Sequence, residues 1–132
     1  MMRCPTDIVD AFAWWRDALA GLKPAITTSP QCGFFQRRFA RGGVMVPVAI
    51  WIEQNINPET GELSDDEKMV CLVNGEPASP DDTWTYCAGN PITESEYRYL
   101  ESRHRWARAH APNDPFASPS KKIDFNSLSP DF

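Results

Sequence analysis

Residues 31–53 read QCGFFQRRFARGGVMVPVAIWIE, and this stretch decides the fold. Its second half places β-branched residues at every second position, which is typical of a strand with one buried aliphatic face: Val44, Val46, Val48, Ile50 and Ile52. Gly42-Gly43 suits a two-residue turn before that strand, because both glycines accept positive φ. The stretch therefore predicts a β-hairpin with these facing pairs: Arg41 with Val44, Phe39 with Val46, and Arg37 with Val48.

The first strand of this hairpin has no purely apolar face, because Arg37, Arg38 and Arg41 are interleaved with phenylalanines. Either the arginine side chains lie along aromatic neighbours, or a bulge changes the register. Pro47 has no N–H for the ladder, so we expect the second strand to be an edge, or to be bulged, at that point.

The segment before the hairpin predicts a helix over residues 8–22. Its apolar residues recur at steps of four and three, like one face of a helix: Ile8, Phe12, Trp15, Leu19 and Leu22. Gly21 and Pro24 supply the stop. We expect this stripe to pack on the sheet, in a core that includes Val46, Val48, Ile50, Leu72, Phe12 and Leu19.

The segments after the hairpin predict more strands and two helices. Residues 69–73 form an apolar run, Asn74-Gly75 is a strong hairpin turn, and Pro77 limits the return strand to a short edge. A short helix should begin after Ser79 and a longer one should cover 94–110, introduced by a capping box at 93–96. His104 and His110 are expected to be exposed polar residues of this longer helix.

Together these elements predict an α+β fold, with an N-terminal helix, a small twisted antiparallel sheet of three or four strands, a C-terminal helix and an irregular tail. We expect residues 1–110 to form a single domain and residues 111–132 to be a proline-rich C-terminal tail. In that tail, four apolar residues are spaced like anchors that lie along the domain or dock on a partner: Ile123, Phe125, Leu128 and Phe132.

Composition narrows the class of protein. The chain has 132 residues, a net charge of −5 and no run of 18 apolar residues, so we expect a cytoplasmic protein without a membrane span. Its four cysteines form no C-x-x-C pair and its two histidines lie six residues apart, outside zinc-finger spacing. The acidic run 55–68 lacks the ligand spacing of an EF-hand. The sequence therefore predicts reduced thiols and neither a metal nor a cofactor.

Charge is segregated along the chain. Residues 31–52 carry three arginines and no acid, whereas residues 53–82 carry nine acids against Lys68 alone. We expect a partner-binding surface that joins the two segments through these residues: Glu59, Glu62, Asp65, Asp66, Glu67, Arg37, Arg38 and Arg41. The alternative is that the arginines form a solvated face, or pair with the acidic loop.

The order CGFF-RR, GG, VPV-IW, PETGELSDDE, CLVNGE and PITESEY resembles small uncharacterised accessory proteins of tailed bacteriophages and prophages. The resemblance covers about residues 8–100, although Val44-Met45 stand where many of those sequences have an aromatic residue. It implies a protein that acts on host or phage macromolecules.

Two functions are open, and neither is enzymatic, because the sequence has no catalytic motif. The first is a non-catalytic phage accessory protein that binds a host or phage protein through its acidic loop, as an inhibitor of host defence of the anti-CRISPR kind does. The alternative is a small nucleic-acid-binding module that uses the arginine and aromatic hairpin. The acidic net charge favours a protein partner over nucleic acid.

Overall fold

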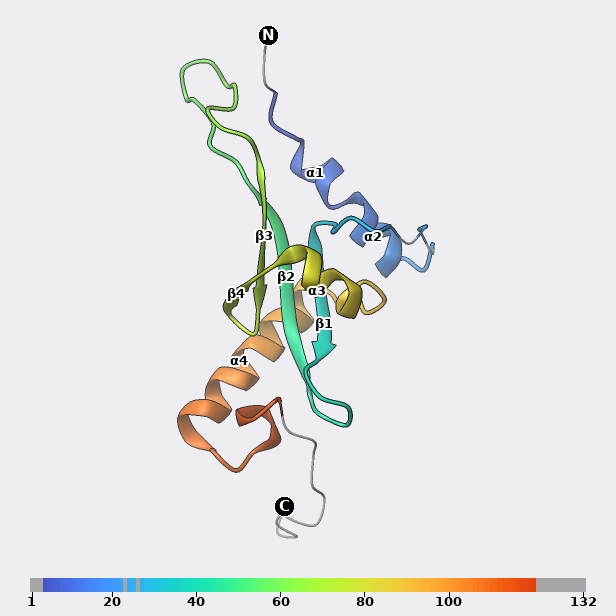
Figure 1. Cartoon of the computed structure of the whole chain (residues 1–132), viewed down its shortest axis with the longest axis vertical. Coiled ribbons are helices and arrows are strands. Elements are labelled where there is room, and N and C mark those ends of the chain that lie inside the picture. Colours follow the sequence, from blue (N-terminus) through green and yellow to red (C-terminus); the bar gives the residue numbers. More distant parts are fainter. Residues whose placement is uncertain (1–3, 23, 26, 121–132) are drawn as a thin grey trace.

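The computed structural model describes residues 4–22, 24–25 and 27–120. It confirms the α+β fold, with N-terminal helices, an open four-stranded antiparallel sheet and a long C-terminal helix (Figure 1). The strands neighbour one another in chain order: β1 (Gly33–Arg38), β2 (Met45–Glu53), β3 (Lys68–Val73) and β4 (Glu76–Ala78). The helices are α1 (Ile8–Ala11), α2 (Ala13–Leu19), α3 (Pro80–Cys87) and α4 (Glu94–His110), followed by the 3-10 turn η1 (Pro115–Ala117).

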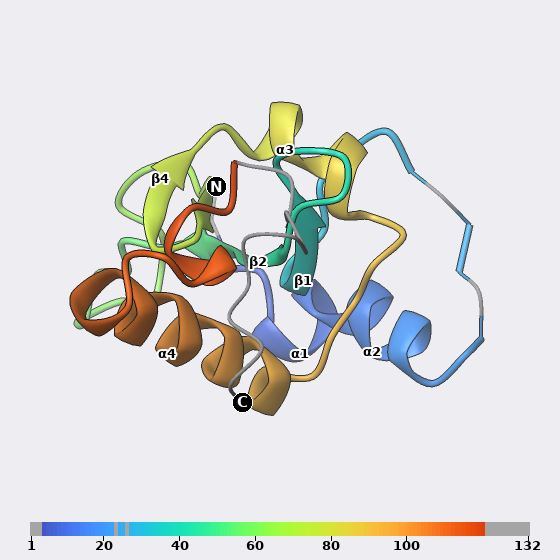
Figure 2. The ribbon, with the colours of Figure 1, turned by 90° about the horizontal axis from the view of Figure 1, so that it is seen from below.

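Helices cover both faces of the sheet, α3 on one face and α4 on the other (Figure 2). The larger core cluster lies under α3 and consists of Phe35, Val46, Val48, Ile50, Cys71, Val73, Trp84 and Cys87. On the other face, Tyr97 of α4 packs with Ala49 and Ile92. Because both faces of β1 meet a helix, Phe34 and Phe35 each find apolar partners, and the strand shows no alternation in sequence.

The central hairpin forms with a register two residues away from the predicted one. Phe35 pairs with Val48, and Arg37 pairs with Val46. The N–H of Gly43 donates to the carbonyl of Ala40, and Gly42 is the turn residue with positive φ, at 78°. The corner is therefore Arg41-Gly42 rather than Gly42-Gly43. Since the shift is two residues, every side chain stays on its predicted face.

Pro47 lies on an inner strand, at a point where β2 has only one strand beside it. It pairs with Gln36 of β1, whereas the pairing of β2 with β3 stops at Val48 and Val73. The Pro47 carbonyl accepts a 2.8 Å hydrogen bond from the N–H of Asn74, in the turn beyond β3. In an antiparallel strand the N–H and C=O of one residue point to the same neighbour. The absence of an N–H at Pro47 therefore removes no hydrogen bond between β2 and β1. At this point β2 is an edge on its β3 side, as expected.

The other local signals are confirmed. Asn74 and Gly75 both have positive φ, at 53° and 83°, and connect β3 to the short edge strand β4. Ser79 caps α3 through the N–H of Asp82. Thr93 and Glu96 form the predicted capping box of α4.

The single helix expected over residues 8–22 is instead two short helices. Phe12 separates α1 from α2 with φ −95° and ψ 6°. After this break the apolar stripe no longer follows one face: Ile8, Leu19 and Leu22 are 51%, 37% and 69% exposed, so the prediction that Leu19 is a core residue is wrong. Of the other predicted core residues, Phe12 and Leu72 are half-buried, and the three aliphatic residues of β2 are buried: Val46, Val48 and Ile50.

The two tryptophans of α2 straddle the outer edge of β1. Trp15 packs edge-on against Phe34, with ring centroids 5.5 Å apart. Trp14 reaches the other face of the sheet, where its ring lies 6.3 Å from Phe35 and 5.1 Å from Trp84. This arrangement needs a glycine in the strand, because a Cβ at Gly33 would lie 2.5 Å from Cγ of Trp15.

The same edge of β1 is covered by the segment that joins α3 to α4. The N–H of Gln36 donates to the carbonyl of Asn90, and the N–H of Ile92 donates to the carbonyl of Phe34, both at 3.0 Å. Phe35 and Pro91 form an isolated antiparallel bridge between these bonds. The chain thus passes from one face of the sheet to the other along the edge of β1.

His104 is buried, which corrects the prediction that it is an exposed polar residue. Its Nε2 lies 2.7 Å from the carbonyl oxygen of Met45, and its Nδ1 lies 3.0 Å from that of Phe116. The ring thereby connects α4 to the start of β2 and to η1. Residues 111–120 consequently pack on α4, although they were expected to belong to the tail. The predicted tail anchors at 123–132 lie outside the described residues.

We predict that Gly33→Ala destabilises the protein by about 1–3 kcal/mol, because the new methyl group overpacks the Trp15 ring. Thermal unfolding should show a melting temperature lower by several degrees. Gly89→Ala is the matched control, since a Cβ there meets nothing within 4 Å, and it should leave the melting temperature nearly unchanged. Equal melting of the two variants would contradict the packing described for Trp15.

Candidate functional site

Residues 54–67 form a long loop, here called the acidic finger, that connects β2 to β3 and projects beyond the sheet (Figure 1). Its backbone continues the hairpin: the N–H of Asn57 donates to the carbonyl of Glu62, the N–H of Ser64 donates to that of Asn55, and Ile56 bridges Leu63. The finger is therefore a defined extension of the sheet that holds its side chains in fixed positions.

The finger carries five carboxylates and no lysine or arginine. Glu59, Asp65 and Asp66 are exposed, and Glu62 is half-buried. Asp65 accepts a 3.0 Å hydrogen bond from Nδ2 of Asn55 across the base of the loop. Four of the predicted site residues thus lie together on one projection: Glu59, Glu62, Asp65 and Asp66.

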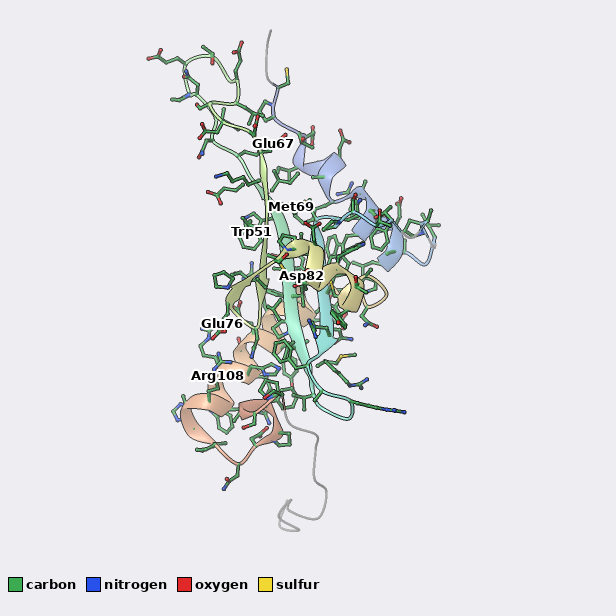
Figure 3. The ribbon with its side chains drawn as sticks, viewed as in Figure 1. Trp51, Glu67, Met69, Glu76, Asp82 and Arg108 are labelled. Carbon is green, nitrogen blue, oxygen red and sulfur yellow. The ribbon has the colours of Figure 1, made fainter. Side chains whose placement is uncertain are left out.

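Glu67, the fifth predicted acid, is hydrogen-bonded within the protein. Its carboxylate accepts hydrogen bonds from Nε2 of Gln54 at 2.6 Å and from the hydroxyl of Thr6 at 2.8 Å. These bonds lower the pKa of the Glu67 carboxyl, and the bond from Gln54 has the largest effect. Figure 3 shows Glu67 where the finger meets the sheet. The residue ties the N-terminal segment to the base of the finger, so we remove it from the set of candidate contact residues.

The three predicted arginines lie at the other end of β2, on and beside the β1–β2 turn. Nε of Arg38 donates to the carbonyl of Gly43 at 3.0 Å, and Arg41 is exposed in the turn. The guanidinium of Arg37 lies 4.3 Å from the ring centroid of Tyr86 and 5.0 Å from that of Phe39. The explanation that the arginines lie along aromatic neighbours is therefore correct for Arg37.

The structure does not join the two charged groups into one surface. They lie at opposite ends of β2, which has nine residues and is about 26 Å long at 3.3 Å per residue. That length is about three times the Debye length of roughly 8 Å at physiological ionic strength. The arginines therefore do not pair with the acidic loop, and each group faces solvent independently of the other.

Sequence reasoning missed Tyr86 as a neighbour of Arg37. Tyr86 belongs to α3, and only the packing of α3 on the sheet brings it beside β1. No local pattern relates residues 37 and 86, so the pair follows from tertiary structure alone.

The buried cysteines are poor nucleophiles. Burial raises the pKa of the Cys87 thiol to about 12 and that of Cys32 to about 11, and it also raises the pKa of Cys71. Cys4 is exposed, and all four are free thiols. Within residues 4–22, 24–25 and 27–120, no three His, Cys, Asp or Glu side chains are grouped so that they could hold a metal ion.

We predict that at pH 8 only the Cys4 thiol of the folded protein reacts quickly with a thiol reagent such as DTNB. A pKa of about 11 or 12 leaves at most about one thiolate in a thousand for Cys32 and Cys87 at that pH. Addition of denaturant should release the remaining thiols. Fast reaction of more than one thiol before denaturation would contradict the burial described for these side chains.

Comparison with protein family models, curated proteins and solved structures found no match to this chain. No helix in the described part of the chain has both the length and the apolar character needed to cross a membrane.

Proposed function

We propose that this chain is a non-catalytic protein that binds a host or phage protein through its acidic finger. One observation carries the proposal: the finger presents its exposed carboxylates at the end of β2 opposite Arg37, Arg38 and Arg41. Because these three arginines lie about 26 Å away along the nine residues of β2, they do not offset the negative field that the finger's carboxylates project into solvent. The partner is expected to offer a basic surface.

A row of carboxylates on an ordered loop imitates a stretch of phosphate backbone. A surface that normally binds nucleic acid is rich in lysine and arginine, and it is therefore the kind of surface that the finger fits. The resemblance to phage accessory proteins supports a finer version of the proposal. In that version the chain is an inhibitor of host defence of the anti-CRISPR kind, and it acts in the host cytoplasm.

Two features support a role without catalysis. Both ring nitrogens of buried His104 already face carbonyl oxygens. The three buried thiols are held protonated by their raised pKa values. Neither group is available to act as a base or nucleophile.

We predict that removing the finger's charge weakens partner binding while the fold is kept. The variant combines isosteric changes that spare Glu67: Glu59→Gln, Glu62→Gln, Asp65→Asn and Asp66→Asn. Four charge pairs with the partner at about 0.5 kcal/mol each amount to roughly 2 kcal/mol, or about 30-fold in Kd. The measurement is capture of proteins from nuclease-treated lysate of the bacterial host at low salt, followed by titration calorimetry with the captured partner.

The matched control removes the same charge from exposed positions outside the finger, with Asp10→Asn, Asp17→Asn, Asp81→Asn and Asp82→Asn. The control should retain the partner, and raised salt should release the partner from the wild type, since salt screens exposed charge. The proposal would be refuted if both variants lost affinity for the partner equally. It would also be refuted if neither raised salt nor the finger variant changed that affinity.

A further inference from the structure

The end of the molecule opposite the finger carries a guanidinium that contacts two aromatic rings. Arg37 lies on β1, Phe39 directly follows that strand, and Tyr86 comes from α3. The centroids of the Phe39 and Tyr86 rings lie 5.0 and 4.3 Å from the guanidinium carbon, within the range of cation–π contact. The two ring contacts hold the guanidinium at this surface.

These three side chains are not a closed part of the core. Phe39 is 42% and Tyr86 is 61% exposed, so both rings offer surface to solvent. Nε of Arg37 donates to the carbonyl of Arg38 at 3.3 Å, whereas its two terminal nitrogens have no hydrogen-bond or ion-pair partner within the described residues. A buried packing role would have covered the rings and satisfied these donors.

An open cavity of about 190 Å³ adjoins the stacked group. Beyond Arg37 and Phe39, it is lined by Val73, Pro77, Ala78, Thr83 and Glu76. Val73, Pro77 and Ala78 are apolar, Thr83 carries a hydroxyl, and Glu76 is the one acid among these lining residues. Glu76 disfavours a phosphate inside the cavity, so an anion is directed to the arginine side and an uncharged planar group to the cavity.

We propose that Arg37, Phe39 and Tyr86 form a binding site for single-stranded nucleic acid. Arg37 binds a phosphate through its free guanidinium nitrogens. Arg41, exposed in the β1–β2 turn, supplies a second positive charge at this end of the sheet, whereas the side chain of Arg38 points to the opposite face of β1. Bases stack on Phe39 and Tyr86, because every base has a π-face that an exposed ring can meet. In a duplex those faces are covered by neighbouring bases.

Single-stranded nucleic acid explains this surface better than an acidic peptide does. A peptide carboxylate would bind the guanidinium alone and would not explain why two exposed aromatic rings contact it. Base stacking uses both the rings and the charge. The site is also remote from the acidic finger, so phosphates that approach it do not meet the finger's carboxylates.

The test is fluorescence anisotropy with the full chain and a fluorescein-labelled, unstructured 12-nucleotide single strand at low salt. Tyr86→Ala should weaken binding by roughly 5- to 150-fold, the range for the loss of one stacked base. Tyr99→Ala is the matched control: Tyr99 is 64% exposed on α4, close to the value for Tyr86, and its loss should change nothing. Arg37→Lys should also weaken binding, because it keeps the charge but loses the planar stack.

Arg98→Lys is the control for that second variant, because Arg98 is exposed on α4 and forms an ordinary i,i+4 ion pair with Glu94. Melting temperatures should show that every variant is folded. Absence of binding by the wild type, equal loss with Tyr86→Ala and Tyr99→Ala, or equal affinity for a duplex of the same sequence would overturn the proposal. Equal displacement of the strand by a 12-residue polyglutamate peptide would also overturn it and would assign the site to an acidic protein.

This inference stands apart from the proposed function. The two sites share no residue, so the finger variant should bind the labelled strand as tightly as the wild type or more tightly. The Tyr86 variant should likewise retain the protein partner.

Discussion

The rest of the structure depends on how the outer edge of β1 is covered. Two backbone hydrogen bonds join this edge to residues 90–92, and Nε1 of Trp15 lies 2.9 Å from the carbonyl oxygens of both Phe34 and Ile92. One indole N–H thereby holds α2, β1 and the crossover between α3 and α4 in a single place. The opposite edge is protected differently, by a β4 of only three residues that contains Pro77.

With the outer edge of β1 covered and helices on both faces, the sheet separates the two charged ends of the molecule. Since α3 and α4 reach opposite faces through a crossover fixed on β1, both faces of β2 are packed along most of its length. The acidic finger extends one end of β2 and the arginine turn closes the other (Figure 1). Figure 3 shows Glu67, at the base of the finger, far from Arg108 of α4. A protein with a modest net charge therefore presents two strongly charged and independent surfaces.

Features set by neighbouring residues could be predicted from sequence. The strand expected over 44–52, the Asn74-Gly75 turn and the capping box at Thr93 each follow from a local pattern, and each is found, the strand as Met45–Glu53. The burial of β2 on both faces, by contrast, depends on the helices that pack on it. Features set by packing could not be predicted. The burial of His104 depends on carbonyl groups 59 residues before it and 12 residues after it, and the place of Tyr86 depends on how α3 meets β1. The charged segments were recognised correctly, but their separation follows from the strand between them, which a count of charges does not reveal.

The covered edge is tested most directly by native-state hydrogen exchange at the amides of Gln36 and Ile92. Both donate across the edge, so they should exchange only when the whole domain unfolds, with protection factors of about 10⁴ or more. Trp15→Phe, which removes the indole N–H, should lower the protection of both amides together. Exchange of these two amides at the rate of exposed peptide groups, while the β2–β3 amides stay protected, would show that the crossover is not held on β1 and would contradict the account.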